Sequence, residues 1–214
     1  MLLNKVIERD FIKVGINSFN EKANGEFVGL NADLAKAVAA AVLGDANKVE
    51  FFVSSISNSL NLVANGEIDI ASTGVTTNSG RDAALNIDYA PTYLYDSQAI
   101  LVNQNSDINH ILDLIGKTIG VVKNTTSENN LVSFFREQGI PFVSQTFENT
   151  TEILNAYDRG EVDAITADRS VLFDVINNLS QPENHFLLDN ELSKEPLALV
   201  IPENDSEWGD IIRW

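Results

Sequence analysis

Apolar residues alternate along this chain in two different periods, and the order of these patterns predicts an α/β fold. Residues 11–17 alternate with period two and are rich in β-branched side chains, which is typical of a strand. Residues 32–43 instead carry one apolar stripe at helical spacing, followed by Gly44 as a C-terminal cap. Further strands are expected at 49–53, 68–72, 90–102, 117–122, 141–147, 162–166 and 197–201. Further helices are expected at 60–64, 111–115, 131–138, 151–159 and 170–179.

One local pattern occurs twice. Residues 66–69 read Gly-Glu-Ile-Asp and residues 160–163 read Gly-Glu-Val-Asp, each between an expected helix and an expected strand. Such a repeat predicts two similar units. A polar loop over residues 73–81, ending in Arg81, follows the first strand, and Asp168 follows the second. One lobe therefore offers a cation and the other an anion, which suits a zwitterionic ligand held in a cleft between the lobes.

The alternation of helices and strands predicts largely parallel sheets, in which ligands bind beyond the carboxyl ends of the strands. The polar loops at 73–81, 124–127 and 166–168 fall at such ends. We expect lobe 1 to comprise residues 1–101, lobe 2 residues 102–195, and residues 196–214 to return to lobe 1. Two crossing segments, near 97–103 and 194–200, would form a two-strand hinge.

Composition narrows the chemistry. The 214 residues carry a formal net charge of −17 and no cysteine, which excludes disulfides and thiolate chemistry. So acidic a chain repels nucleic acids and anionic lipid surfaces. The two histidines, His110 and His185, have no ligand partner at metal-binding spacing, so neither a metal nor a cofactor is expected. No apolar run approaches membrane-spanning length, and residues 1–6 lack a signal-peptide core, which predicts a mature or engineered form if the protein is secreted.

Several short sequence motifs occur along the chain in the order and spacing of a known protein family. It resembles the periplasmic solute-binding proteins (family 3 type) of polar and general L-amino-acid ABC transporters. The residues that carry this resemblance are 27–34 (Phe-Val-Gly-Leu-Asn-Ala-Asp-Leu), 66–69, Thr76-Thr77, Arg81-Asp82, 88–91 (Asp-Tyr-Ala-Pro), 116–121, 124–126 (Asn-Thr-Thr), 162–164, Asp168, 193–197 (Ser-Lys-Glu-Pro-Leu), Trp208 and Arg213-Trp214.

The resemblance implies a two-lobed, type II periplasmic-binding-protein-like fold that closes over one free L-amino acid. The protein would be a monomer outside the cytoplasm, periplasmic or extracellular. It would deliver its ligand to the membrane permease of an ABC transporter and would have no catalytic residue. Many relatives continue well past Trp214, so the C-terminal part of lobe 1 is expected to be truncated here.

The resemblance also assigns roles in lobe 1. Arg81 would grip the ligand carboxylate, because a guanidinium offers two parallel donors to a carboxylate. Thr76 would contact both the carboxylate and the amine, and Gly74 would offer its backbone carbonyl. Phe19 would cover the aliphatic stem of the ligand.

In lobe 2, Thr126 would donate to the ligand carboxylate from the start of a helix, where unpaired N–H groups favour anions. Thr125 and Glu128 have the spacing of a helix-capping pair. Asp168 would hold the ammonium group. Asn124 stands where relatives often have Gly, and the turn is expected to survive because Asn tolerates a positive φ.

Each charged residue also has a plainer interpretation. Arg81 would be a surface cation paired with Asp82 or Asp88, and Asp168 would cap the helix at 170–179. At the level of function, two alternatives stay open. One is an enzyme, since some relatives of this fold are dehydratases of arogenate or prephenate. The other is the ligand-binding module of a receptor or sensor kinase.

Overall fold

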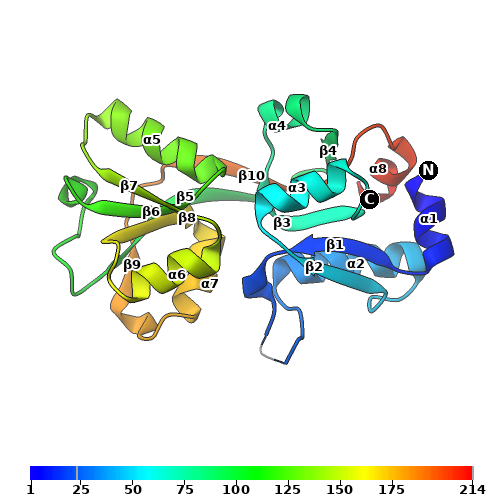
Figure 1. The fold of residues 1–214 in the computed structure, drawn as a ribbon, viewed down its shortest axis with the longest axis horizontal. Coiled ribbons are helices and arrows are strands. Elements are labelled where there is room, and N and C mark those ends of the chain that lie inside the picture. Colours follow the sequence, from blue (N-terminus) through cyan, green and yellow to red (C-terminus); the bar gives the residue numbers. More distant parts are fainter. Residues whose placement is uncertain (23, 214) are drawn as a thin grey trace. The chain divides into compact units, whose positions relative to one another are not determined.

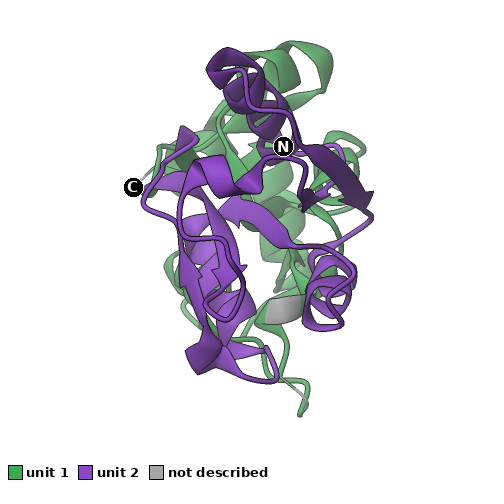
Figure 2. Ribbon diagram, turned by 90° about the vertical axis from the view of Figure 1, so that its left-hand side faces the viewer, with its two compact units in different colours: residues 1–94, 196–214 green, residues 95–195 purple. Residues whose placement is uncertain are grey.

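The computed structural model describes residues 1–22 and 24–213, except for the side chain of Phe19, and the chain forms two compact units (Figure 2). Unit 1 comprises Met1–Leu94 and Pro196–Trp214, and unit 2 comprises Tyr95–Glu195. The chain therefore passes from one unit to the other twice, within β5 (Leu94–Asn103) and within β10 (Ser193–Pro202). Residue 101, where the sequence pattern puts the end of lobe 1, lies inside β5.

Unit 1 is built on a sheet with the strand order β2-β1-β3-β10 (Figure 1). Strand β1 is parallel to β2 and β3, whereas β10 runs antiparallel to β3 and to the short β4. The strands are β1 (Ile12–Ile16), β2 (Val49–Val53), β3 (Ile70–Thr76) and β4 (Ile87–Tyr89). The helices are α1 (Leu2–Arg9), η1 (Ser18–Asn20), α2 (Leu30–Leu43), α3 (Ile56–Ala64), α4 (Ser79–Ala84) and α8 (Ser206–Ile212).

Alternation along the strands of unit 1 divides its core between the two faces of the sheet. Val14 and Ile70 pack with residues of α1, α2 and α8, including the fully buried Trp208. Ala71, the next residue of β3, packs with α3 on the opposite face. Helices therefore cover both faces, as expected where parallel strands are joined by helical crossovers.

Unit 2 repeats this plan with the strand order β5-β8-β6-β7. Strand β6 is parallel to β7 and β8, whereas β5 runs antiparallel to β8 and to the short β9. The strands are β6 (Thr118–Val122), β7 (Val143–Phe147), β8 (Ala164–Asp168) and β9 (His185–Leu187). The helices are η2 (Ile111–Leu114), α5 (Thr126–Gln138), α6 (Thr150–Asp158), α7 (Arg169–Asn177) and η3 (Pro182–Asn184).

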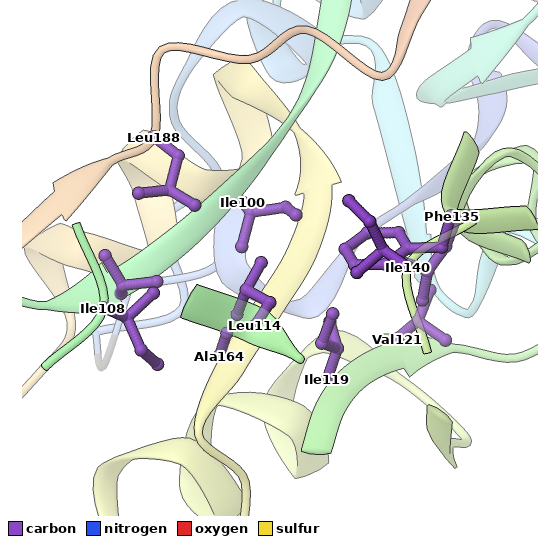
Figure 3. Close-up of a cluster of buried hydrophobic side chains, with 11 residues drawn as sticks. Ile100, Ile108, Leu114, Ile119, Val121, Phe135, Ile140, Ala164 and Leu188 are labelled. Atoms are coloured by element: carbon purple, nitrogen blue, oxygen red, sulfur yellow. The ribbon is translucent and has the colours of Figure 1, made fainter. Parts of the chain in front are cut away.

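Helix α5 covers one face of this second sheet, and α6 and α7 cover the other. Phe135 of α5 is fully buried against sheet residues, and Figure 3 shows this cluster with Ile100, Ile108, Leu114, Ile119, Val121, Ile140, Ala164 and Leu188. On the other face, Ile165 of β8 packs against Ile153 of α6 and Leu172 of α7. This packing holds the body of α5 against the sheet.

The sequence repeat has the same structural meaning in both units. The carboxylate of Asp69 accepts a hydrogen bond from the backbone N–H of Lys13 at 2.7 Å, and that of Asp163 accepts one from Thr118 at 2.8 Å. Each aspartate immediately precedes a strand, β3 or β8, and ties it to the start of its parallel neighbour, β1 or β6. The short sequence repeat therefore marks the same place in the strand pairing of both units.

The sequence pattern is wrong about residues 73–81, which were expected to form one loop. Strand β3 continues to Thr76, because β10 supplies an antiparallel partner from more than 100 residues away. Helix α4 then begins at Ser79, capped by Asn78, whose side-chain oxygen accepts from the N–H groups of Gly80 and Arg81. Helix α1 and strand β9 were not expected at all, since both are short and owe their stability to tertiary packing.

Candidate functional site

In unit 1, two of the predicted ligand-binding residues lie on β3. Gly74 adopts φ +68°, a conformation that favours glycine, although no atom lies within 4 Å of the place a Cβ would take. Ala198 pairs with Val75 and Val200 with Ala71, so β3 carries extra residues opposite β10 at this point. The resulting bulge disrupts the ladder next to Gly74. Thr76, which is buried, closes the strand.

Arg81 follows β3 on the first turn of α4. Its backbone N–H donates to the side chain of Asn78 at 3.0 Å, which fixes the start of the helix relative to the end of β3. The side chain lies near Tyr89: burial raises the pKa of the Tyr89 hydroxyl, and the positive charge of Arg81 opposes that rise. Unit 1 thus places Gly74, Thr76 and Arg81 in one short segment that runs from the carboxyl end of β3 into α4.

In unit 2, the predicted capping of α5 is confirmed. The hydroxyl of Thr125 accepts from the backbone N–H of Glu128 at 3.2 Å, and the Glu128 carboxylate accepts from the N–H of Asn124 at 2.8 Å. Asn124 has φ +60°, as its tolerance of that conformation predicted. Thr126 is the first residue of the helix, where backbone N–H groups have no intrahelical partner and the helix dipole favours negative charge.

Asp168 is buried at the carboxyl end of β8, and the structure brings it to the first turn of α5. The hydroxyl of Ser127 donates to the Asp168 carboxylate at 3.5 Å. The interpretation of Asp168 as a helix cap is wrong: its side chain makes no capping bond to α7. The carboxylate of Asp96, from β5, takes that role by accepting from the N–H of Ser170 at 3.0 Å.

The structure brings three further polar side chains to this place that the sequence pattern does not single out: Ser127, Gln98 and Glu195. All three are buried, and they contact the first turn of α5 or belong to it. Gln98 stands at the start of an otherwise apolar strand run, a signal that could have marked it. Nothing in the local sequence pattern of Glu195 places it beside a helix that begins 69 residues earlier.

Phe19 lies in η1, and its side chain is outside the described residues. In the described part of the chain, no group of three or more His, Cys, Asp or Glu side chains is placed to hold a metal ion. Likewise, no helix described here is both long and apolar enough to cross a membrane. What the two units present is instead a set of hydrogen-bonding groups, with Arg81 on unit 1 and Asp168 on unit 2.

Comparison with known proteins identifies the class to which this architecture belongs. Residues 12–212 match the model of the bacterial extracellular solute-binding proteins, family 3. The chain belongs to this family, which consists of binding proteins and not of enzymes.

Named relatives agree with this assignment. The chain is 33% identical over 217 residues to the general L-amino acid-binding periplasmic protein AapJ of Rhizobium johnstonii, which covers 99% of this chain and 64% of the relative. It is also 33% identical over 192 residues to the glutamate/glutamine/aspartate/asparagine-binding protein BztA of Rhodobacter capsulatus, covering 90% of this chain and 57% of the relative. The chain thus spans less than two thirds of the length of these relatives.

Among solved structures, a periplasmic binding protein from Brucella ovis with glutathione bound superposes with a TM-score of 0.95. It is 33% identical, and the alignment covers all of this chain and 68% of that one. The two-unit α/β fold expected from the sequence is therefore the fold of periplasmic binding proteins.

Proposed function

We propose that this protein binds a free L-amino acid outside the cytoplasm and delivers it to the membrane permease of an ABC transporter. One observation carries the proposal: the two equivalent units present opposite charges, with Arg81 just after β3 and Asp168 at the end of the matching strand β8. An amino acid has opposite charges on neighbouring groups. The names of AapJ and BztA, both amino-acid-binding proteins, support the same ligand class.

In this proposal, Arg81 and Thr76 bind the ligand carboxylate, with Thr76 also contacting the amine and Gly74 offering its carbonyl to the ammonium group. Asp168 holds the ammonium from unit 2, and Thr126 donates to the carboxylate from the start of α5. Charge-assisted hydrogen bonds of this kind are about twice as strong as neutral ones. A ligand that touches both units favours the state in which both can reach it, which gives hinge closure.

The proposal also includes the oligomeric state and the location of the protein. The protein acts as a monomer in the periplasm or at the outer cell surface, with no nucleic-acid partner. Phe19 covers the aliphatic stem of the ligand. The Brucella ovis relative carries glutathione, whose γ-glutamyl end retains an α-amino and an α-carboxyl group. Larger ligands with such an end therefore belong in any test.

A thermal-shift screen against the twenty amino acids, glutathione and matching des-amino acids tests the proposal. A ligand that binds only the folded protein, present at 100 times its dissociation constant, stabilises it by about 2.7 kcal/mol. We expect several L-amino acids to raise the melting temperature and their des-amino analogues to have little effect. A screen in which no amino acid raises it, while another solute class does, would contradict the proposed ligand.

A further inference from the structure

The first turn of α5 is held by a buried amide that comes from a crossing strand. Gln98 of β5 is fully buried, and its Nε2 donates to the backbone carbonyl of Ser127 and to the Thr166 hydroxyl, both at 2.9 Å. The Thr166 hydroxyl in turn donates to the carbonyl of Ala99 at 2.7 Å. Gln98 is also the cross-strand partner of Asp168. One side chain therefore ties the start of α5 to the strand pair that carries Asp168.

A buried carboxylate holds the same turn from the other crossing strand. Glu195 of β10 is only 2% exposed and accepts from Asn130 Nδ2 at 2.8 Å, from the Thr126 hydroxyl at 3.4 Å, and from the Ser193 hydroxyl. Thr126 and Asn130 are four residues apart, so they lie on one face of α5. Glu195 thus binds the residue that begins the helix together with the residue one turn later.

Attaching a helix to a sheet through buried polar groups costs desolvation free energy. An ionised carboxylate loses its hydration on burial, and only good hydrogen bonds and the positive end of a helix dipole offset that loss. Well-packed apolar side chains often serve stability as well as buried charged groups do, or better. What directional hydrogen bonds add is a defined position for the groups that they hold.

We propose that Gln98 and Glu195 are positioning residues for ligand binding, which fix Thr126 and Ser127 relative to Asp168. This inference rests on the proposed function, because it assumes that Thr126 and Asp168 contact the ligand. Gln98 and Glu195 act through the first turn of α5. Because both belong to the strands in which the chain crosses between units, the ligand-binding turn is held by the crossing strands themselves.

A double-mutant cycle between Glu195 and Thr126 tests the proposal by calorimetry, using the amino acid that gives the largest thermal shift. We expect Glu195→Gln to weaken binding by about tenfold or more, since the amide keeps only one acceptor oxygen and has no charge to strengthen the bonds from Asn130 and Thr126. In a Thr126→Val background, Glu195→Gln should weaken binding clearly less, because both substitutions remove the same contact. Equal losses in both backgrounds would overturn the positioning role, since general destabilisation adds independently.

Three further variants complete the design. Ser193→Ala removes a Glu195 partner that is not on α5, and it should leave affinity within about twofold of the unaltered protein. Asn130→Ala leaves Glu195 in place and should weaken binding, so it carries the same test if Glu195→Gln does not fold. Unchanged affinity in Asn130→Ala and Gln98→Leu would overturn the inference alone. Failure of the unaltered protein to bind any amino acid would overturn the proposed function as well.

Discussion

At the scale of single residues, most of the proposed chemistry depends on two side chains of opposite charge, Arg81 in α4 after β3 and Asp168 at the end of β8. The backbone of Arg81 is held by the capping of α4 by Asn78, and Asp168 is buried beside the first turn of α5. Asp168 is not needed as a helix cap, because Asp96 performs that role for α7. Asp168 therefore contacts the first turn of α5, through the Ser127 hydroxyl, and its side chain does not cap α7.

Replacing Arg81 by Ala should weaken amino-acid binding by at least about thirtyfold. Removing one member of a desolvated charge pair costs about 2–5 kcal/mol, because the ligand carboxylate loses its partner. Isothermal titration calorimetry measures the change. Arg136→Ala is the matched control. It also removes a positive charge, but from an exposed position near the end of α5, and it should leave affinity unchanged. Equal affinity of Arg81→Ala and the unaltered protein would disprove the role of Arg81.

Replacing Asp168 by Asn should weaken the binding of the amino acid about tenfold more than the binding of its des-amino analogue. The carboxylate is proposed to hold the ammonium group, which the analogue lacks, and charge-assisted bonds are stronger than neutral ones. Competition binding with both ligands measures this difference, and Asp189→Asn, on an exposed loop, is the matched control. Parallel losses for both ligands would argue against an ammonium contact.

At the scale of elements, strand β1 of unit 1 and the equivalent strand β6 of unit 2 each have a glycine that other side chains approach closely. A Cβ added to Gly15 of β1 would lie 2.7 Å from the Ser59 hydroxyl and 2.9 Å from Ile68 Cδ1. A Cβ on Gly120 of β6 would lie 3.1 Å from Ile165 and 3.2 Å from Ile153. A Cβ at Gly15 would therefore force its neighbours to move, whereas at Gly120 the neighbouring side chains would have to give by a few tenths of an ångström.

Gly15→Ala and Gly120→Ala should each lower stability, with the larger loss at Gly15, where the contacts are closer. Overpacking of this kind costs about 1–3 kcal/mol, which urea denaturation can measure. Gly209→Ala is the matched control, because its Cβ would meet Ile201 at an ordinary 3.4 Å within helix α8. The packing argument fails if Gly15→Ala is as stable as Gly209→Ala.

At the scale of the whole molecule, the dominant property is charge. A formal net charge of −17 makes the folded state repel itself, and salt screens that repulsion. The screening length falls from about 30 Å at 0.01 M to about 8 Å at 0.15 M ionic strength. A chain this acidic also repels further copies of itself, in line with the proposed monomer.

Raising sodium chloride from 0.01 M to 0.15 M should therefore raise the melting temperature by about 2 °C or more. In a chain of this size, each 1 kcal/mol of added stability raises the melting temperature by about 2–4 °C. Differential scanning calorimetry measures the shift. Light scattering on the same samples should report a mass near 23.5 kDa. A melting temperature that falls over this range would show that attractive ion pairs outweigh the net repulsion.

Much of the fold could be read from the sequence, because it depends on short-range patterns. Residues 49–53 were expected as a strand and form β2 with those bounds, and the helix expected at 32–43 is the body of α2. The repeated Gly-Glu-x-Asp predicted two equivalent units, and the matching bonds of Asp69 and Asp163 confirm them. Periodicity decides which face of an element is apolar, and capping residues decide where it begins, so both are legible locally.

The surroundings of the proposed ligand-binding residues were decided only by tertiary structure. Ser127 meets Asp168 across 41 residues, and Glu195 meets Thr126 across 69. No local pattern encodes such pairs, because they depend on how helices pack on a sheet and on which strands pair. The same holds for β3, which extends to Thr76 because distant β10 supplies its partner. The sequence by itself determined the elements, the repeat and the charges, whereas tertiary packing decided which polar groups share a site.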